Sequence, residues 1–305
     1  MPRPLRDPEA FLKRLEWTVI RRLDGLLQGN YRTLFRGHGL DLAGLREYQH
    51  GDDVRHIDWN VTARLNTPYV REYHEDREIN AWFLLDLSAS VDFGARVKKQ
   101  AVSAGFVTVL ARLLTRQGNR VGAILYGAGI DNVIPARSGR RHVLHLLHAL
   151  QSRPVLPASR GTDLGELLAG ARQALTRRSM VFLVSDFISA PGWEKPLAQL
   201  AQRHEIVAVR LYDPLENELP DAGMLVMQDA ETGEQLFVDT ADRAFRQRFA
   251  AAAQRREAAL RAAFRDAGID ALELSTDDDL IETVMRFADM RRRRNRLGNH
   301  ALSVA

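Results

Sequence analysis

The sequence contains no cysteine. This absence excludes a disulfide scaffold, thiolate zinc sites, iron–sulfur clusters and a catalytic cysteine. Long apolar runs are missing as well: the longest, residues 101–114, is shorter than the roughly 18 residues that span a bilayer, and it contains Arg112. The N-terminal residues lack the apolar core and small-residue cleavage site of a signal peptide. We therefore expect a soluble, cytoplasmic protein without stable membrane insertion.

Several catalytic motifs are also lacking. No Gly-rich loop ending in Gly-Lys-Ser or Gly-Lys-Thr occurs, so we do not expect the chain to hydrolyse ATP by itself. No Gly-x-Ser-x-Gly elbow is present either. The sequence shows no evident constellation of a nucleophile and a general base. It therefore gives no direct indication of an enzyme.

Positive charge exceeds negative charge by only four, and it gathers at one end of the chain. Arg291–Arg294 and Arg296 carry five positive charges, so the rest of the chain is nearly neutral. A basic surface that binds duplex DNA is usually spread over a folded face. We interpret the arginines as the solvated cationic end of a helix, with nucleic-acid binding as the alternative. No nucleic-acid partner is expected.

What the sequence does contain is the composition of a folded protein. Hydrophobic residues make up 45% and charged residues 27% of 305 residues. This length allows one large domain with a substantial extension. We divide the chain into an N-terminal region of residues 1–78, a domain of residues 79–290 and a basic tail of residues 291–305.

The N-terminal region has two parts. Residues 8–28 place apolar side chains at helical spacing, which predicts an amphipathic helix that packs on its own domain or, alternatively, lies on a membrane. Residues 30–78 contain alternating stretches at 56–61 and 69–73 with a turn at 66–68, which predicts a small β-rich extension with a hairpin. Its polar composition gives it too few apolar residues to fold alone, so we expect it to pack on the following domain.

From about residue 79 the pattern alternates between strands and helices. Short apolar runs predict strands at 82–87, 120–126, 131–135, 180–185, 205–211 and 269–274, and a short hairpin at 223–239. Helical periodicity predicts helices at 94–116, 138–151, 163–177, 191–203, 241–267 and 277–292. Such alternation is typical of an α/β fold with a doubly wound, mostly parallel sheet and helices on both faces.

Oxygen-bearing side chains follow the strands of this predicted sheet. Asp86, Ser88 and Ser90 alternate at the end of the first strand, Thr162 precedes a helix, and Asp186 follows another buried strand. The carboxyl ends of parallel strands meet at one edge of a sheet, where ligands bind. Carboxylates and hydroxyls are hard donors that suit Mg²⁺ or Mn²⁺. The Asp86–Ser90 stretch taken alone is also typical of a helix N-cap.

These five positions resemble the metal-ion-dependent adhesion site of von Willebrand factor A domains. The Asp-x-Ser-x-Ser triplet, the threonine of a Gly-Thr-Asp loop and the later aspartate match in order and spacing. The resemblance implies a von Willebrand A-like fold for residues 79–290. It also implies that all five side chains bind Mg²⁺ or Mn²⁺, with one coordination position left for an acidic residue of another protein.

A second resemblance covers the extension. Residues 45–59 (LREYQHGDDVRHIDW), followed by Ala63-Arg64 and Val70-Arg71-Glu72, are similar to the pattern of the bacterial family called domain of unknown function 58. Members carry this segment just before a von Willebrand A domain, and their genes typically neighbour those of MoxR-type AAA+ ATPases. The resemblance implies a co-chaperone or adaptor for such an ATPase in protein assembly or maturation. Many members have membrane helices ahead of this segment, which this chain does not show.

The charged segment of the extension has two interpretations. The first is a salt-bridged scaffold that orders a polar stretch, and the alternative is a binding surface. We predict Asp58 and Trp59 as scaffold residues, because a buried indole needs a partner and a carboxylate can accept hydrogen bonds from neighbouring amides.

Two classes of function follow for the whole chain. The first is a non-enzymatic, metal-dependent binding module whose metal edge, rather than the arginine tail, faces the partner: a MoxR-type ATPase or a client protein that supplies a carboxylate. The second is an Mg²⁺-dependent hydrolase in which the same side chains activate water. No lysine or arginine clamp is evident near the five positions, which favours the binding module.

Overall fold

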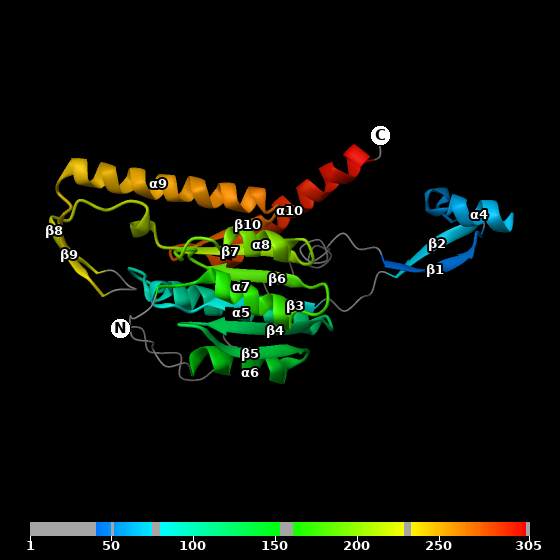
Figure 1. Ribbon diagram of the computed structural model, residues 1–305, viewed down its shortest axis with the longest axis horizontal. Coiled ribbons are helices and arrows are strands. Elements are labelled where there is room, and N and C mark those ends of the chain that lie inside the picture. The colour runs from blue at the N-terminus through cyan, green and yellow to red at the C-terminus, as the bar shows by residue number, and fades with distance from the viewer. Residues whose placement is uncertain (1–40, 50–51, 75–79, 153–160, 229–232, 303–305) are drawn as a thin grey trace. The chain divides into compact units, whose positions relative to one another are not determined.

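The computed structural model describes residues 41–49, 52–74, 80–152, 161–228 and 233–302 (Figure 1). The helix predicted at residues 8–28 lies outside these ranges. The chain divides into two compact units, one spanning Arg36–Glu78 and the other containing all described residues from Asn80 onwards. The expected packing of the extension on the larger unit stays a prediction.

The smaller unit is built on a two-stranded antiparallel sheet. Strand β1 (Asp41–Glu47) pairs with β2 (Tyr69–His74), and the connection between them contains the 3-10 helix η2 (Val54–His56) and helix α4 (Trp59–Leu65). The expected β-rich extension is therefore present. The predicted hairpin between residues 56–61 and 69–73 is wrong, because the first of these stretches is largely helical and β2 pairs with β1 instead.

The sequence explains this local correction. The carboxylate of Asp58 accepts hydrogen bonds from the backbone N–H groups of Asn60 (3.0 Å) and Val61 (3.2 Å), as an N-cap does. Asn66 ends the helix in the left-handed conformation at φ 55°. Asp58 is buried and orders the segment as expected, but Trp59 is 69% exposed and is not a buried scaffold residue.

The larger unit contains a six-stranded sheet of the predicted type. Its order is β10-β7-β6-β3-β4-β5, and every neighbouring pair is parallel except β4 and β5. The strands, in chain order, are β3 (Asn80–Asp86), β4 (Arg120–Tyr126), β5 (Ile130–Arg137), β6 (Met180–Ser185), β7 (Glu205–Tyr212) and β10 (Asp270–Ser275).

Helices cover both faces of this sheet, because successive strand residues point to opposite sides. In β3, Phe83 and Leu85 belong to one buried cluster, whereas Trp82 and Leu84 belong to the other. The first cluster is covered by α5 (Lys99–Arg116), α6 (Arg140–Gln151) and α10 (Leu280–Leu302), and the second by α7 (Leu164–Ala174), α8 (Glu194–Ala201) and α9 (Arg243–Asp266). Both faces are thus closed, as the apolar strands predict.

A small antiparallel hairpin precedes α9, as predicted. Its strands are β8 (Met224–Gln228) and β9 (Gln235–Asp239), and Figure 1 shows it below the N-terminal end of α9. Among the described residues, no helix has both the length and the apolar character needed to cross a membrane.

The last helix differs from its prediction. Helix α10 continues to Leu302, so the residues assigned to a separate tail from residue 291 begin inside a helix. Arg291 is 6% exposed rather than solvated. Its guanidinium forms an ion pair with Glu205 at the start of β7, and its Nε lies 2.9 Å from Asp270 Oδ2 at the start of β10. Arg293 is exposed.

We predict that Arg291→Met lowers the free energy of unfolding by about 3 kcal/mol, because it leaves two partly buried carboxylates without their cation. The matched change Arg293→Met removes the same charge from an exposed position and should alter stability by less than about 0.5 kcal/mol. Urea unfolding of both variants measures the difference. Equal, small effects would contradict a structural role for Arg291.

Candidate metal centre

Asp86 is the buried base of the candidate centre. It is the last residue of β3 and is fully buried. Its Oδ1 accepts a hydrogen bond from the Ser88 backbone N–H (3.0 Å), and its Oδ2 accepts one from the Ser185 hydroxyl (2.6 Å). Burial, together with the negative charge of Asp186, raises the pKa of Asp86 to about 6, although the hydrogen bonds from Ser185 and Ser88 act in the opposite direction.

The two serines of the triplet lie together beside this carboxylate. Ser88 precedes the 3-10 helix η3 (Ala89–Asp92), which contains Ser90, and both residues are buried. Their hydroxyl oxygens are 3.1 Å apart. The chain therefore turns immediately after Asp86, and this turn gathers one carboxylate and two hydroxyls within five residues.

Asp186 approaches from the neighbouring strand. Strands β3 and β6 are paired in parallel with Leu85 opposite Val184, so both chains leave the sheet at the same edge. Asp186 is 4% exposed, and its Oδ1 accepts a hydrogen bond from the Ile188 backbone N–H (3.0 Å). The charge of Asp186 acts on the Asp86 carboxyl, as the raised pKa of Asp86 indicates.

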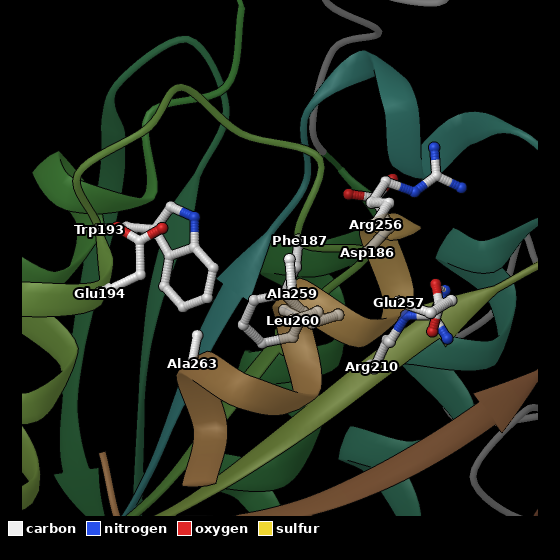
Figure 2. Close-up of a pocket in the computed structure, with 10 residues that line it drawn as sticks. All are labelled: Asp186, Phe187, Trp193, Glu194, Arg210, Arg256, Glu257, Ala259, Leu260 and Ala263. Atoms are coloured by element: carbon white, nitrogen blue, oxygen red, sulfur yellow. Dashed lines mark hydrogen bonds and ion pairs between the residues drawn. The ribbon is translucent and has the colours of Figure 1, made fainter. Parts of the chain in front are cut away.

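The residue after Asp186 adopts an unusual backbone conformation. Phe187 has φ 59°, which a bulky L-residue rarely adopts. Its ring lies 5.6 Å from the Trp193 ring and 4.9 Å from the Phe264 ring, between centroids, so aromatic packing holds the turn. Asp186 and Phe187 also line a cavity of about 160 Å³, and Figure 2 shows Trp193 and the Arg210–Glu257 ion pair on opposite sides of it.

Thr162 is joined to the same edge through its backbone. The residue is 1% exposed, and its carbonyl accepts hydrogen bonds from the Ala190 N–H (2.8 Å) and the Ser189 hydroxyl (3.0 Å). These two residues follow Asp186 on the same loop. The following residue, Asp163, caps α7, so the Gly-Thr-Asp loop serves both as a helix start and as part of the edge.

Lys99 occupies the centre as well, and the sequence analysis missed it. This first residue of α5 is fully buried, and its Nζ lies 2.7 Å from Asp186 Oδ2 and 2.6 Å from Glu216 Oε1. The expectation that no lysine lies near the five positions is therefore wrong. The helical spacing could have indicated that Lys99 is buried, because this residue lies on the same helix face as the buried residues Ser103 and Phe106.

Glu216 and Asp213 connect the centre to its surroundings. Both belong to the capping box of the 3-10 helix η4 (Pro214–Glu216) after β7. Asp213 accepts hydrogen bonds from the Ala95 N–H (3.0 Å) and the Thr276 hydroxyl (2.7 Å). Burial opposes ionisation of Asp213, but these bonds, the Leu215 N–H and the charge of Lys99 together lower the pKa of Asp213. Asp213 thus ties together the loops that follow β3, β7 and β10.

The donor set fits a hard divalent cation. Two buried carboxylates, two adjacent serine hydroxyls and the buried Thr162 offer only oxygen, the donor that Mg²⁺ and Mn²⁺ prefer. A cation near Asp86 would offset the burial and like-charge repulsion that raise the pKa of this residue. Within the described ranges, no group of three or more His, Cys, Asp or Glu side chains is placed to hold a metal ion. Any metal here would depend on the hydroxyls as much as on the carboxylates.

The larger unit has the mostly parallel α/β sheet with helices on both faces that the resemblance to von Willebrand A domains implies. The chain belongs to the family described as "Protein of unknown function DUF58", which matches residues 44–259. The match starts within the smaller unit, as the charged segment at residues 45–59 predicts.

Relatives cover nearly the whole chain, and some solved structures are similar to parts of it. Uncharacterized proteins of Mycobacterium tuberculosis and Mycobacterium bovis are each 39% identical over 290 residues, which cover 94% of this chain and 91% of theirs. Among solved structures, BatB from Bacteroides thetaiotaomicron is similar with a TM-score of 0.46 at 14% identity, covering 70% of this chain and 99% of that one. The SpRpn10 VWA domain is similar with a TM-score of 0.38 at 13% identity, covering 68% and 94%.

The buried charge of Asp86 yields a prediction for the metal-free protein. A carboxyl whose folded-state pKa is raised from 3.8 to about 6 contributes stability at low pH that is lost as the pH rises through 6. Asp86→Asn removes this loss and keeps an acceptor for the Ser88 N–H. In EDTA at pH 8 we expect Asp86→Asn to raise the free energy of unfolding by up to about 3 kcal/mol.

The gain should shrink as the pH is lowered from 6 to 4, and urea unfolding across this range measures it. Asp163→Asn is the matched control, since Asp163 is exposed at the start of α7. This control should produce no comparable gain. A stability difference for Asp86→Asn that is independent of pH would contradict the assignment of a strained, buried carboxylate.

Proposed function

We propose that the chain is a metal-dependent protein-binding module that holds Mg²⁺ or Mn²⁺ with Asp86, Ser88, Ser90, Thr162 and Asp186. The observation that carries the proposal is the pair of buried carboxylates at adjacent strand ends. Burial and the charge of Asp186 raise the pKa of Asp86, and a bound cation would offset both causes. When bound, the metal would act as a Lewis acid toward an oxygen donor from outside.

The partner's donor is an acidic side chain. The five protein oxygens do not fill the six coordination positions that Mg²⁺ prefers, and a carboxylate is the strongest oxygen donor that a protein surface offers. Such a bond is strong only where water is excluded, so the partner must close over the edge around Ser88 and Asp186.

We propose a MoxR-type AAA+ ATPase as the partner, with the chain acting as a co-chaperone or adaptor in the assembly or maturation of other proteins. Membership of the DUF58 family supports this proposal, because the resemblance of the charged segment implies that association. In this arrangement either the ATPase or a client protein supplies the carboxylate.

Isothermal titration calorimetry with Mg²⁺ and with Mn²⁺ tests the metal site. We expect the wild type to bind with modest affinity, because Mg²⁺ gives up its water reluctantly and the partner's donor is missing. Ser88→Ala should weaken binding by about tenfold or more, because it removes one oxygen donor without changing the charge.

Ser179→Ala is the matched control. Ser179 is as buried as Ser88, at 6% exposure, but it lies just before β6, at the opposite end of that strand from Asp186. This variant should bind the metal like the wild type. Absence of binding by the wild type, or equal binding by both serine variants, would refute the metal assignment.

The partner surface is tested by co-precipitation of the purified chain with a MoxR-type ATPase, with and without EDTA. We expect EDTA and Ser88→Ala each to reduce the association by at least about tenfold. Changing Arg292, Arg293 and Arg294 to glutamine should leave most of it, because the charge of the exposed Arg293 is screened by salt and Arg291 keeps its buried ion pairs. Loss of binding in the arginine variant alone would instead favour electrostatic tethering by the end of α10.

A further inference from the structure

Lys99 is a buried lysine inside the candidate centre. It is fully buried, and its ammonium contacts both Asp186 and Glu216, at 2.7 and 2.6 Å. The Phe93 ring centroid lies 5.8 Å from Nζ. A buried ammonium is costly unless anions compensate it, so the two carboxylates hold Lys99 in place. One proposed metal ligand is therefore already bound to a cation of the protein itself.

We propose that Lys99 is a built-in counter-ion that competes with the divalent metal for the charge of Asp186. This inference rests on the proposed metal site and concerns how that site is regulated. Buried charges a few ångströms apart interact strongly and are screened little by salt. Lys99 thus lowers the affinity of the centre for metal alone, in addition to orienting Asp186.

The same charge favours the partner's carboxylate. Asp86, Asp186 and Glu216 together carry three negative charges when ionised, and a divalent cation with Lys99 balances them. Without Lys99 the metal-loaded centre would carry an excess negative charge, which repels an incoming acidic side chain. Lys99 therefore shifts affinity from the free metal to the metal with its partner.

Glu216 has the opposite effect on the metal. It shares the ammonium of Lys99 with Asp186, and so it leaves more of the negative charge of Asp186 for a metal ion. Its own carboxylate adds further negative charge near the centre. Removal of Lys99 and removal of the charge of Glu216 must then change metal affinity in opposite directions, which a purely structural role for Lys99 does not predict.

Calorimetry with Mg²⁺ on the full chain tests the proposal in four variants. Lys99→Met and Lys99→Gln should bind Mg²⁺ about tenfold tighter than the wild type, and Glu216→Gln about threefold to tenfold weaker. Lys99→Gln keeps a hydrogen-bond donor without the charge, so this variant separates the effect of charge from that of positioning. Lys98→Met is the matched control, because Lys98 is exposed and pairs with Asp92 on the surface; it should change the affinity by less than about twofold.

Each outcome decides between the proposals. Tighter binding by both Lys99 variants and weaker binding by Glu216→Gln would support the counter-ion role of Lys99. If the Lys99 variants bind Mg²⁺ but the wild type does not, the counter-ion role is supported, and metal binding by the native chain is refuted. Unchanged or weaker binding by Lys99→Gln, with measurable binding by the wild type, overturns the counter-ion and leaves the metal site standing. Absence of binding in every protein overturns both. If Lys99→Met does not fold, Lys99→Gln and Glu216→Gln still give opposite predicted signs.

Discussion

The parallel pairing of β3 with β6 is the constraint on which the candidate centre depends. With Leu85 opposite Val184, the two strands end side by side, and Asp86 and Asp186 leave the sheet at one edge. Neither carboxylate can be moved away from the other without a change in the register of two fully buried strands. The like-charge interaction is therefore built into the core of the fold. Ser185 donates a hydrogen bond to Asp86, and Lys99 forms an ion pair with Asp186. The capping box at Asp213 includes Glu216, the second partner of Lys99.

The order of elements in the larger unit and the placement of Asp86, Ser88, Ser90 and Asp186 at one edge of its sheet could be predicted, because both follow from local patterns. Apolar runs define the strands, and in a parallel sheet the residues after each strand meet at a common edge. The contacts that bring Lys99 and Glu216 to the centre could not be predicted in the same way. Lys99 contacts Asp186 across 87 positions of the chain and Glu216 across 117 positions, and nothing in the local sequence states this proximity.

The wrong predictions for residues 56–61, Trp59 and Arg291 have the same physical origin, because local sequence does not show tertiary contacts. Alternation at residues 56–61 suggested a strand, but the Asp58 cap outweighs that weak pattern and starts a helix, which leaves Trp59 exposed. Arg291 looked like part of a solvated run, yet it faces two strand starts that carry Glu205 and Asp270. Sequence periodicity describes which face of an element a residue occupies. It does not say what lies opposite that face.

The left-handed turn at Phe187 has a consequence for how the protein folds. A glycine would adopt this conformation without strain, whereas phenylalanine adopts it at a cost of about 1–3 kcal/mol. The turn is held by Trp193 before α8 and by Phe264 near the end of α9. Because Phe264 follows Phe187 by many residues, this part of the packing around the turn forms only after α9 has been synthesised. We expect the edge beside Asp186 to be among the last parts of the domain to become ordered during folding.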